Sequence, residues 1–197
     1  KECFKTLLLG LVETCFEQIK IKEETSVTIN EKICEIYSFV AVSLNRVSQF
    51  QKSLEYSERN QNMAQTFGNE ALEATALSAM GNSYFLMGMV RESLDAYEKS
   101  LEIAVKINEL YLRVESTLGL VEVYWELAQY QKSLALAKEA WSLLEKEEFT
   151  PLKSESLLTL GVIQHDIDLS QAAFEKICQA LEIARLKKYR YLECKAL

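Results

Sequence analysis

The chain has 197 residues, of which 49 % are hydrophobic and 26 % are charged, and it carries a formal net charge of -7. These proportions exclude a disordered chain, and the acidic balance argues against nucleic acid as a partner, because nucleic-acid binders carry a basic surface that meets the phosphates. One Pro and six Gly in the whole chain favour long helices over a loop-rich β fold.

Predicted helices follow one another along the whole chain. The first contains the apolar run 7–12, which is too short to cross a bilayer because a span takes about 20 residues, so no membrane association is predicted. Further along, Leu77, Met80, Tyr84 and Met87 follow the three- and four-residue spacing of one helix face. Such spacing predicts helices near 2–22, 29–46, 50–66, 70–87, 90–107, 110–127, 130–147, 151–167, 170–186 and 189–197.

Several helix boundaries have their own sequence signals. Gly68 ends one predicted helix and Asn69 precedes the next, in keeping with the preference for glycine after a helix and for a side-chain acceptor before one. Thr150 and Pro151 match an N-cap followed by proline at the first helical position. These signals support helices joined by short turns.

The sequence repeats itself with a period of 40 residues. Segment 50–54 reads Phe-Gln-Lys-Ser-Leu and segment 130–134 reads Tyr-Gln-Lys-Ser-Leu, with Val-Arg-Glu-Ser-Leu midway at 90–94. Repeats of this length indicate stacked supersecondary units, and we expect one solenoid domain over 1–197. Its blocks are about 30–68, 69–108, 109–148 and 149–188, with a preceding helix in 1–29 and the start of a further repeat in 189–197.

Small residues recur where the paired helices are expected to cross, because a small side chain lets two helices approach closely. They are Gly81, Ser93, Ser100, Gly161, Ala173 and Ala180.

The block that runs Leu77, Met80-Gly81, Tyr84, Gly88, Ser93, Tyr97 and Ser100-Leu101 resembles the tetratricopeptide repeat (TPR) consensus. The resemblance covers about residues 30 to 197 and implies an all-α fold, a right-handed superhelical solenoid of antiparallel helix pairs with about nine to ten helices. Two departures are the period, 40 rather than 34 residues, and the missing consensus proline at most repeat boundaries.

Long repeats of this kind resemble those of bacterial multidomain signalling proteins, kinesin light chains and some polarity scaffolds. The resemblance therefore implies a cytoplasmic protein-interaction module, the sensory or scaffolding region of a larger protein with an output domain such as a diguanylate cyclase or histidine kinase. Because the chain begins with Lys1 rather than Met, and 189–197 begin another repeat, we expect a piece of a longer protein.

In TPR proteins the first helix of each pair lines a concave groove, and the resemblance carries the groove positions onto this chain. Acidic side chains there surround an apolar centre that includes Leu158. Only Asn82 matches the clamp that binds carboxylate tails of chaperones, so that ligand mode is not expected. The predicted partner is a basic or amphipathic protein or peptide, with Trp125 as anchor. The predicted partner-binding residues are Asn82, Phe85, Leu86, Glu115, Glu122, Trp125, Glu126, Glu155 and His165.

Other interpretations stay open. The glutamates could form an ordinary solvated face, and Trp125 and Phe85 could pack between neighbouring helices, as we expect for Trp141 and for the tyrosines at 97, 111 and 130. Self-assembly, in which the exposed solenoid ends make a homodimer, is an alternative function.

Catalysis within this segment is the weakest alternative. The single histidine, His165, lies beside Asp166 and Asp168 but lacks a nucleophile or a metal partner. No phosphate loop or dinucleotide fingerprint occurs, and the five cysteines include no Cys-x-x-Cys, so no cofactor, zinc site or disulfide framework is predicted. We expect the cysteines to be small core residues.

Overall fold

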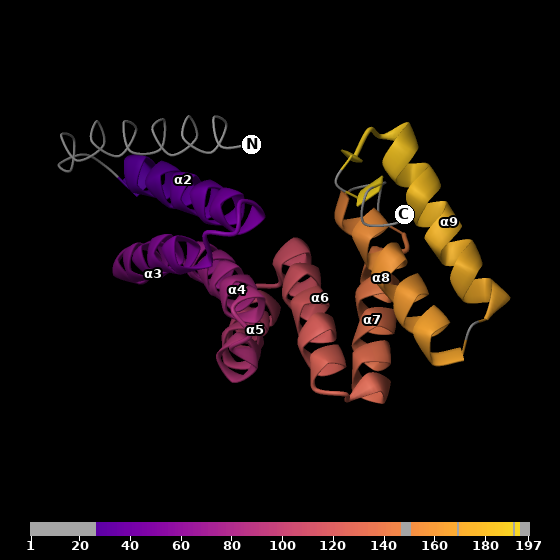
Figure 1. Cartoon of the computed structure of the whole chain (residues 1–197). Helices are drawn as coiled ribbons and strands as arrows, with labels where there is room; N and C mark the ends of the chain where they lie inside the picture. The colour runs from indigo at the N-terminus through magenta and orange to yellow at the C-terminus, as the bar shows by residue number, and fades with distance from the viewer. Residues whose placement is uncertain (1–26, 147–150, 169, 191, 194–197) are drawn as a thin grey trace. The chain divides into compact units, whose positions relative to one another are not determined.

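The computed structural model describes residues 27–146, 151–168, 170–190 and 192–193, and every regular element in them is a helix (Figure 1). The all-α prediction is thereby confirmed, and the boundaries agree with the predicted ranges within a few residues. The helices are α2 (Val27–Arg46), α3 (Phe50–Phe67), α4 (Glu70–Leu86), α5 (Val90–Lys106), α6 (Leu110–Glu126), α7 (Tyr130–Leu144), α8 (Pro151–Asp168) and α9 (Gln171–Leu186).

The predicted helix near 2–22 and the predicted N-cap Thr150 lie outside the described residues. Past α9 the chain becomes helical again at Arg190, where a further helix was predicted.

The chain falls into two compact units, Lys1–Ala96 and Tyr97–Leu197, so that the boundary lies within α5. In the first unit α2 packs against α3 and α4, and α3 packs against α4. In the second unit each of α6, α7 and α8 packs against the helix that follows it, and α6 also contacts α8 (Figure 1). A single solenoid domain over 1–197 stays a prediction.

Helix α5 shows how the sequence creates these packed faces. Ser93, Ala96, Ser100 and Ala104 are buried at intervals of three and four residues, which places them on one side of the helix. The charged residues between them, such as Glu102, are exposed. Small buried side chains let the neighbouring helix approach closely.

The two helices of a pair are tied together by a repeated serine hydrogen bond. The hydroxyl of Ser53 donates to the carbonyl of Ala41, that of Ser93 to Gly81, and that of Ser133 to Val121, each at 2.8 Å. The donor lies twelve residues after the acceptor in every case, so the bond has the same place in three successive pairs.

The fourth pair, α8 and α9, has Ala173 in place of the serine, and its helices cross at a glycine instead. A Cβ atom at Gly161 would lie 2.9 Å from Cγ1 of Ile177 and 3.1 Å from the carbonyl oxygen of Ala173. The prediction of small residues at the helix crossings is confirmed, since all six are buried.

The turns between helices share one geometry that recurs about every 20 residues. Each ends its helix with a residue of positive φ, after which a backbone N–H donates to the carbonyl five residues earlier, as Met89 does to Tyr84 at 2.9 Å. This is the Schellman motif, which satisfies the last carbonyl groups of a helix. The positive-φ residues are Ser48, Gly68, Gly88, Asn108, Ala128 and Lys188.

The N-terminal ends of two helices are capped by side chains. The side chain of Asn69 accepts a hydrogen bond from the N–H of Leu72 at 3.1 Å, and Ser170 accepts one from Ala173 at 3.2 Å. Asn69 was predicted to precede a helix, and Gly68 adopts the left-handed conformation expected of the residue that ends one.

The described cysteines differ in burial. Cys34 is buried, as predicted, whereas Cys178 is exposed on α9, so the prediction of a core position is wrong for Cys178. Cys178 is not among the α9 positions that face the neighbouring helix, which are Ala173, Ala180 and Ala184. The other three cysteines lie outside the described residues.

Candidate functional site

The predicted partner-binding residues lie on the first helices of the pairs, α4, α6 and α8. In the first unit, Asn82 and Phe85 are half-buried and Leu86 is exposed, all near the end of α4. In the second unit, Glu115 and Glu126 are exposed, whereas the other four predicted residues are half-buried. These four are Glu122, Trp125, Glu155 and His165.

The predicted apolar centre of the groove needs a correction at Leu158. This side chain is 2 % exposed and belongs to a core cluster with Leu157 and Ala180. Its place on α8 faces the paired helix α9, so it cannot meet a ligand at the surface.

Trp125 contacts the interior of the second unit. Its ring packs against a buried cluster that contains Val121 and Leu160, and lies 4.7 Å from the ring of Tyr130, centroid to centroid, at 59°. Trp125 therefore packs between helices while part of its surface stays accessible. Its role as an anchor for a partner stays a prediction.

The tyrosines that were assigned to the core do not all lie there. Tyr97 is buried as predicted, but Tyr111 and Tyr130 are exposed, so the assignment is wrong for these two. Both stand in the first turn of a helix, α6 and α7 respectively. Trp141 is half-buried against core clusters, with Nζ of Lys153 5.7 Å from its ring centroid.

His165 lies at the surface of α8. Its Nδ1 is 3.5 Å from a carboxylate oxygen of Asp166, and both side chains are largely exposed. Within the described ranges no group of three or more His, Cys, Asp or Glu side chains could hold a metal ion. The arrangement supplies neither a nucleophile nor a Lewis acid for catalysis at His165.

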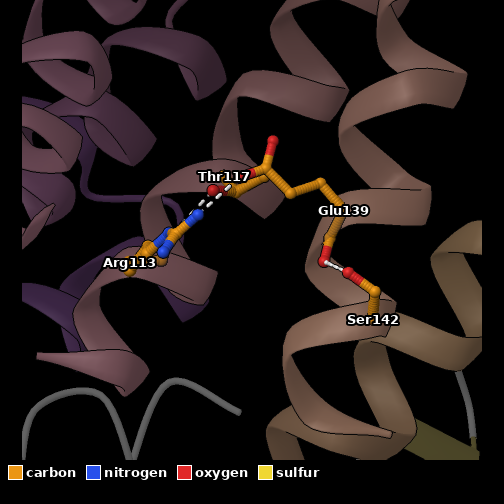
Figure 2. Close-up of polar contacts among 4 residues, drawn as sticks. All are labelled: Arg113, Thr117, Glu139 and Ser142. Atoms are coloured by element: carbon orange, nitrogen blue, oxygen red, sulfur yellow. Dashed lines mark hydrogen bonds and ion pairs between the residues drawn. The ribbon is translucent and has the colours of Figure 1, made fainter.

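Helix α6 is joined to its partner helix by charged and polar contacts (Figure 2). Arg113 donates from Nη2 to the carboxylate of Glu139 on α7 at 2.8 Å, and the hydroxyl of Thr117 donates to the carbonyl of Arg113 at 2.7 Å. Ser142 donates to the carbonyl of Glu139 at 2.8 Å. These contacts fix the side of α6 that faces α7.

Another side of α6 carries carboxylates around a buried tyrosine. Glu115, Gly119 and Glu122 are spaced by four and three residues, which places them on one face of the helix. The ring of Tyr97, from α5, lies on Gly119 so closely that a Cβ atom there would overlap ring atoms Cε1 and Cζ. The hydroxyl of Tyr97, attached to Cζ, is thus held between the positions of the two glutamates.

The electrostatics of this face are unusual. Burial by the surrounding protein, with the negative charge of Glu155 adding to it, raises the pKa of Glu115 to about 7, although the residue keeps more than a third of its surface accessible. Burial raises the pKa of Tyr97 well above 10, with contributions from the charges of Glu122, Glu115 and Glu155. We call Tyr97, Glu115, Glu122 and Glu155 the acidic cluster.

The sequence contained a signal for the tyrosine that we did not use. At the repeat positions of Tyr97 and Gly119, the preceding block has Ser57 and Ala79, and the next block has Ala137 and Thr159. The second block alone combines a large ring with a glycine 22 residues later. Such compensating sizes indicate contact.

The comparisons with known proteins agree with this fold. The model of the tetratricopeptide repeat family matches residues 32–105. A curated relative, the 43 kDa receptor-associated protein of the synapse from Gallus gallus, is 25 % identical over 112 residues, which are 57 % of this chain and 27 % of that protein. The chain thus spans about a quarter of that relative's length.

Solved structures share the fold at low sequence identity. The Rap conjugation gene regulator of the plasmid pLS20, in complex with the Phr* peptide, is 15 % identical with a TM-score of 0.82, and the match covers 99 % of this chain and 53 % of that one. A signal transduction ATPase with a tetratricopeptide repeat sensor from Pyrococcus horikoshii is 20 % identical with a TM-score of 0.69, covering 95 % and 29 %.

A putative kinesin light chain with TPR-like repeats from Podosopora anserina is 17 % identical with a TM-score of 0.65, covering 94 % of this chain and 90 % of that one. No helix in the described parts of the chain is long and apolar enough to cross a membrane. The family match and the shared fold identify this chain as a tetratricopeptide repeat protein.

Proposed function

We propose that the chain is a protein-interaction module that binds a basic or amphipathic polypeptide on the first helices of its pairs. The observation that carries the proposal is the row of accessible carboxylates on α6 and α8, at Glu115, Glu122, Glu126 and Glu155. Carboxylates arranged along one face complement cationic side chains and steer their approach. The accessible parts of Trp125 and Leu86 would take apolar side chains of the same ligand.

Two of the similar structures support this choice. The Rap regulator holds a peptide, as its description states, and the ATPase from Pyrococcus horikoshii is described as carrying its repeats as a sensor. We propose the same general role for this chain, as the sensory or scaffolding part of a larger cytoplasmic signalling protein.

Selection from a random peptide library displayed on phage would test the proposal. We expect enriched peptides to combine Arg or Lys with apolar residues, and to lose binding when Glu122→Lys and Glu126→Lys are introduced together. The matched control, Glu102→Lys with Glu182→Lys, changes the net charge equally at exposed positions on second helices and should preserve binding. Equal loss in both variants, or no enrichment at all, would reject the proposal.

Self-association is the second candidate function. It is favoured by exposed apolar side chains on α9, where Phe174 is 54 % and Leu186 is 74 % exposed, because large exposed apolar groups often mark interaction sites. Sedimentation velocity would test it. A dimer that Phe174→Ser and Leu186→Ser abolish would support self-association, and a monomer at every concentration would reject it.

A further inference from the structure

We propose that the acidic cluster, Tyr97 with Glu115, Glu122 and Glu155, is a subsite for one arginine side chain of the bound polypeptide. The inference rests on the proposed function and specifies the partner's chemistry. It comes from the second unit alone, since all four residues lie within Tyr97–Leu197.

The hydroxyl of Tyr97 is the observation that points to a ligand. The residue is only 5 % exposed, and its hydroxyl makes no hydrogen bond with any residue that the structure describes. Buried tyrosine hydroxyls usually have a partner. A ligand with N–H donors would satisfy this oxygen, which can accept a hydrogen bond.

The position of the ring directs that hydroxyl toward the carboxylates. Because Cε1 and Cζ are the ring atoms nearest to Gly119, the hydroxyl lies over α6 between Glu115 and Glu122. Helix α8 contacts α6 and brings Glu155 to the same cluster, as its effect on the pKa of both Tyr97 and Glu115 indicates. Acceptors thus surround the hydroxyl from two helices.

The spread of these acceptors favours a guanidinium over a metal ion. No metal-binding group of carboxylates is found among the described residues, so the glutamates do not converge on a single point. A guanidinium is planar, carries five N–H donors and stays charged at all relevant pH values. It can contact several separated acceptors at once, which the compact ammonium of lysine does less well.

The basic groups nearest in sequence to the cluster are directed to other partners. Arg113 pairs with Glu139 of α7 (Figure 2), and Lys132 of α7 donates to the hydroxyl of Tyr124 at 2.6 Å. Lys153 of α8 donates to the carbonyl of Glu145 at 2.7 Å. The groups that face Glu115 are therefore Tyr97 from α5, Glu122 from α6 and Glu155 from α8.

Binding at this subsite is linked to the loss of a proton. With a pKa of about 7, Glu115 carries its proton in half of the molecules at neutral pH, and an arginine favours the ionised form. If only that form binds, the affinity rises about tenfold between pH 6 and pH 8. An ordinary glutamate would give no change over this range.

The test uses small blocked probes and the whole chain. N-acetyl-arginine amide is titrated in NMR experiments beside N-acetyl-lysine amide and the neutral isostere N-acetyl-citrulline amide. We expect arginine to bind more tightly than lysine, citrulline not to bind, and the arginine affinity to rise about tenfold from pH 6 to pH 8. Glu115→Gln should abolish this pH dependence, whereas the control Glu102→Gln should retain it.

Tyr97→Phe tests the hydroxyl, because it keeps the ring on Gly119. We expect arginine affinity to fall by about two- to tenfold while the melting temperature stays within a few degrees of the original. Equal binding of arginine and citrulline, or unchanged affinity in both Tyr97→Phe and Glu115→Gln, would overturn the subsite. Library peptides that still bind through Glu122 and Glu126 would then show that the proposed function survives without it.

Discussion

At the scale of single residues, the contact between Tyr97 and Gly119 organises the second unit's most distinctive feature. A ring from α5 is accommodated because α6 has no side chain beneath it. The same contact holds a buried hydroxyl between carboxylates and brings Glu115 into surroundings that raise its pKa. Packing and electrostatics therefore depend on the same glycine.

Gly119→Ala should destabilise the protein, although alanine is the better helix former. The added Cβ atom would overlap the ring of Tyr97, which is buried and cannot move aside freely, so we expect a loss of about 1–3 kcal/mol in the free energy of unfolding. Urea denaturation measures it. In a Tyr97→Ala background the same substitution should become neutral or stabilising; a loss of equal size there would contradict this account.

Glu115 should make stability depend on pH. Its pKa rises from 4.5 in the unfolded chain to about 7 in the folded one, so the folded state binds more protons between these values. Stability from this group is fully present below pH 4.5 and is lost as the pH rises through 7.

Glu115→Gln should therefore be more stable than the original protein at pH 8, with the difference shrinking toward pH 5. Denaturation at pH 5, 6, 7 and 8 would measure the effect, with Glu102→Gln as the control that shows no such trend. A constant difference across this range would mean that Glu115 titrates normally.

At the scale of elements, the turns are conformationally alike but differ in sequence. Gly68 and Gly88 adopt positive φ easily, whereas Ser48, Asn108 and Ala128 adopt it with a Cβ atom present. For an L-residue that conformation costs about 1–2 kcal/mol, while a glycine costs about 0.4–1 kcal/mol more in lost freedom on folding. The pattern of hydrogen bonds, rather than glycine alone, thus maintains the turn.

Ala128→Gly should stabilise the protein by about 0.5 kcal/mol, since relief of the steric cost exceeds the added entropy cost. Gly88→Ala at the equivalent turn should destabilise it by about 1 kcal/mol. Denaturation midpoints of both variants, measured together, provide the comparison. Shifts of the same sign would show that the turn conformation does not control these effects.

At the scale of the whole molecule, stability should be distributed over neighbouring helix pairs. In repeat proteins each unit contacts only its neighbours, and each of the two units here has its own packed helices. The predicted single solenoid would then respond locally to a local change.

Gly161→Val should accelerate amide hydrogen exchange in α8 and α9 far more than in α3 and α4. The new side chain would press on Ile177 and on the carbonyl of Ala173, at the crossing of the last pair. Exchange measured by mass spectrometry, with Val162→Ala on the exposed side of α8 as the control, would resolve the regions. Equal acceleration in all helices would indicate one cooperative unit instead.

The sequence by itself determined the helices, their pairing and most helix boundaries. This was possible because these features depend on local spacing, such as Leu77, Met80 and Tyr84 on one face, and on repetition, such as the serines at 53, 93 and 133. The predicted site residues followed from the repeat positions, and they lie at accessible or half-buried places on the first helices.

Only the tertiary structure decided which side chains of those helices reach the surface and what surrounds them. Leu158 occupies a predicted groove position but is covered by α9, and Tyr130 is exposed where a core position was expected. The pKa of Glu115 depends on Glu155, forty residues away, and the surroundings of Tyr97 depend on Gly119. Burial and charge at a residue are set by every helix packed around it, and a pattern within one helix contains no information about the others.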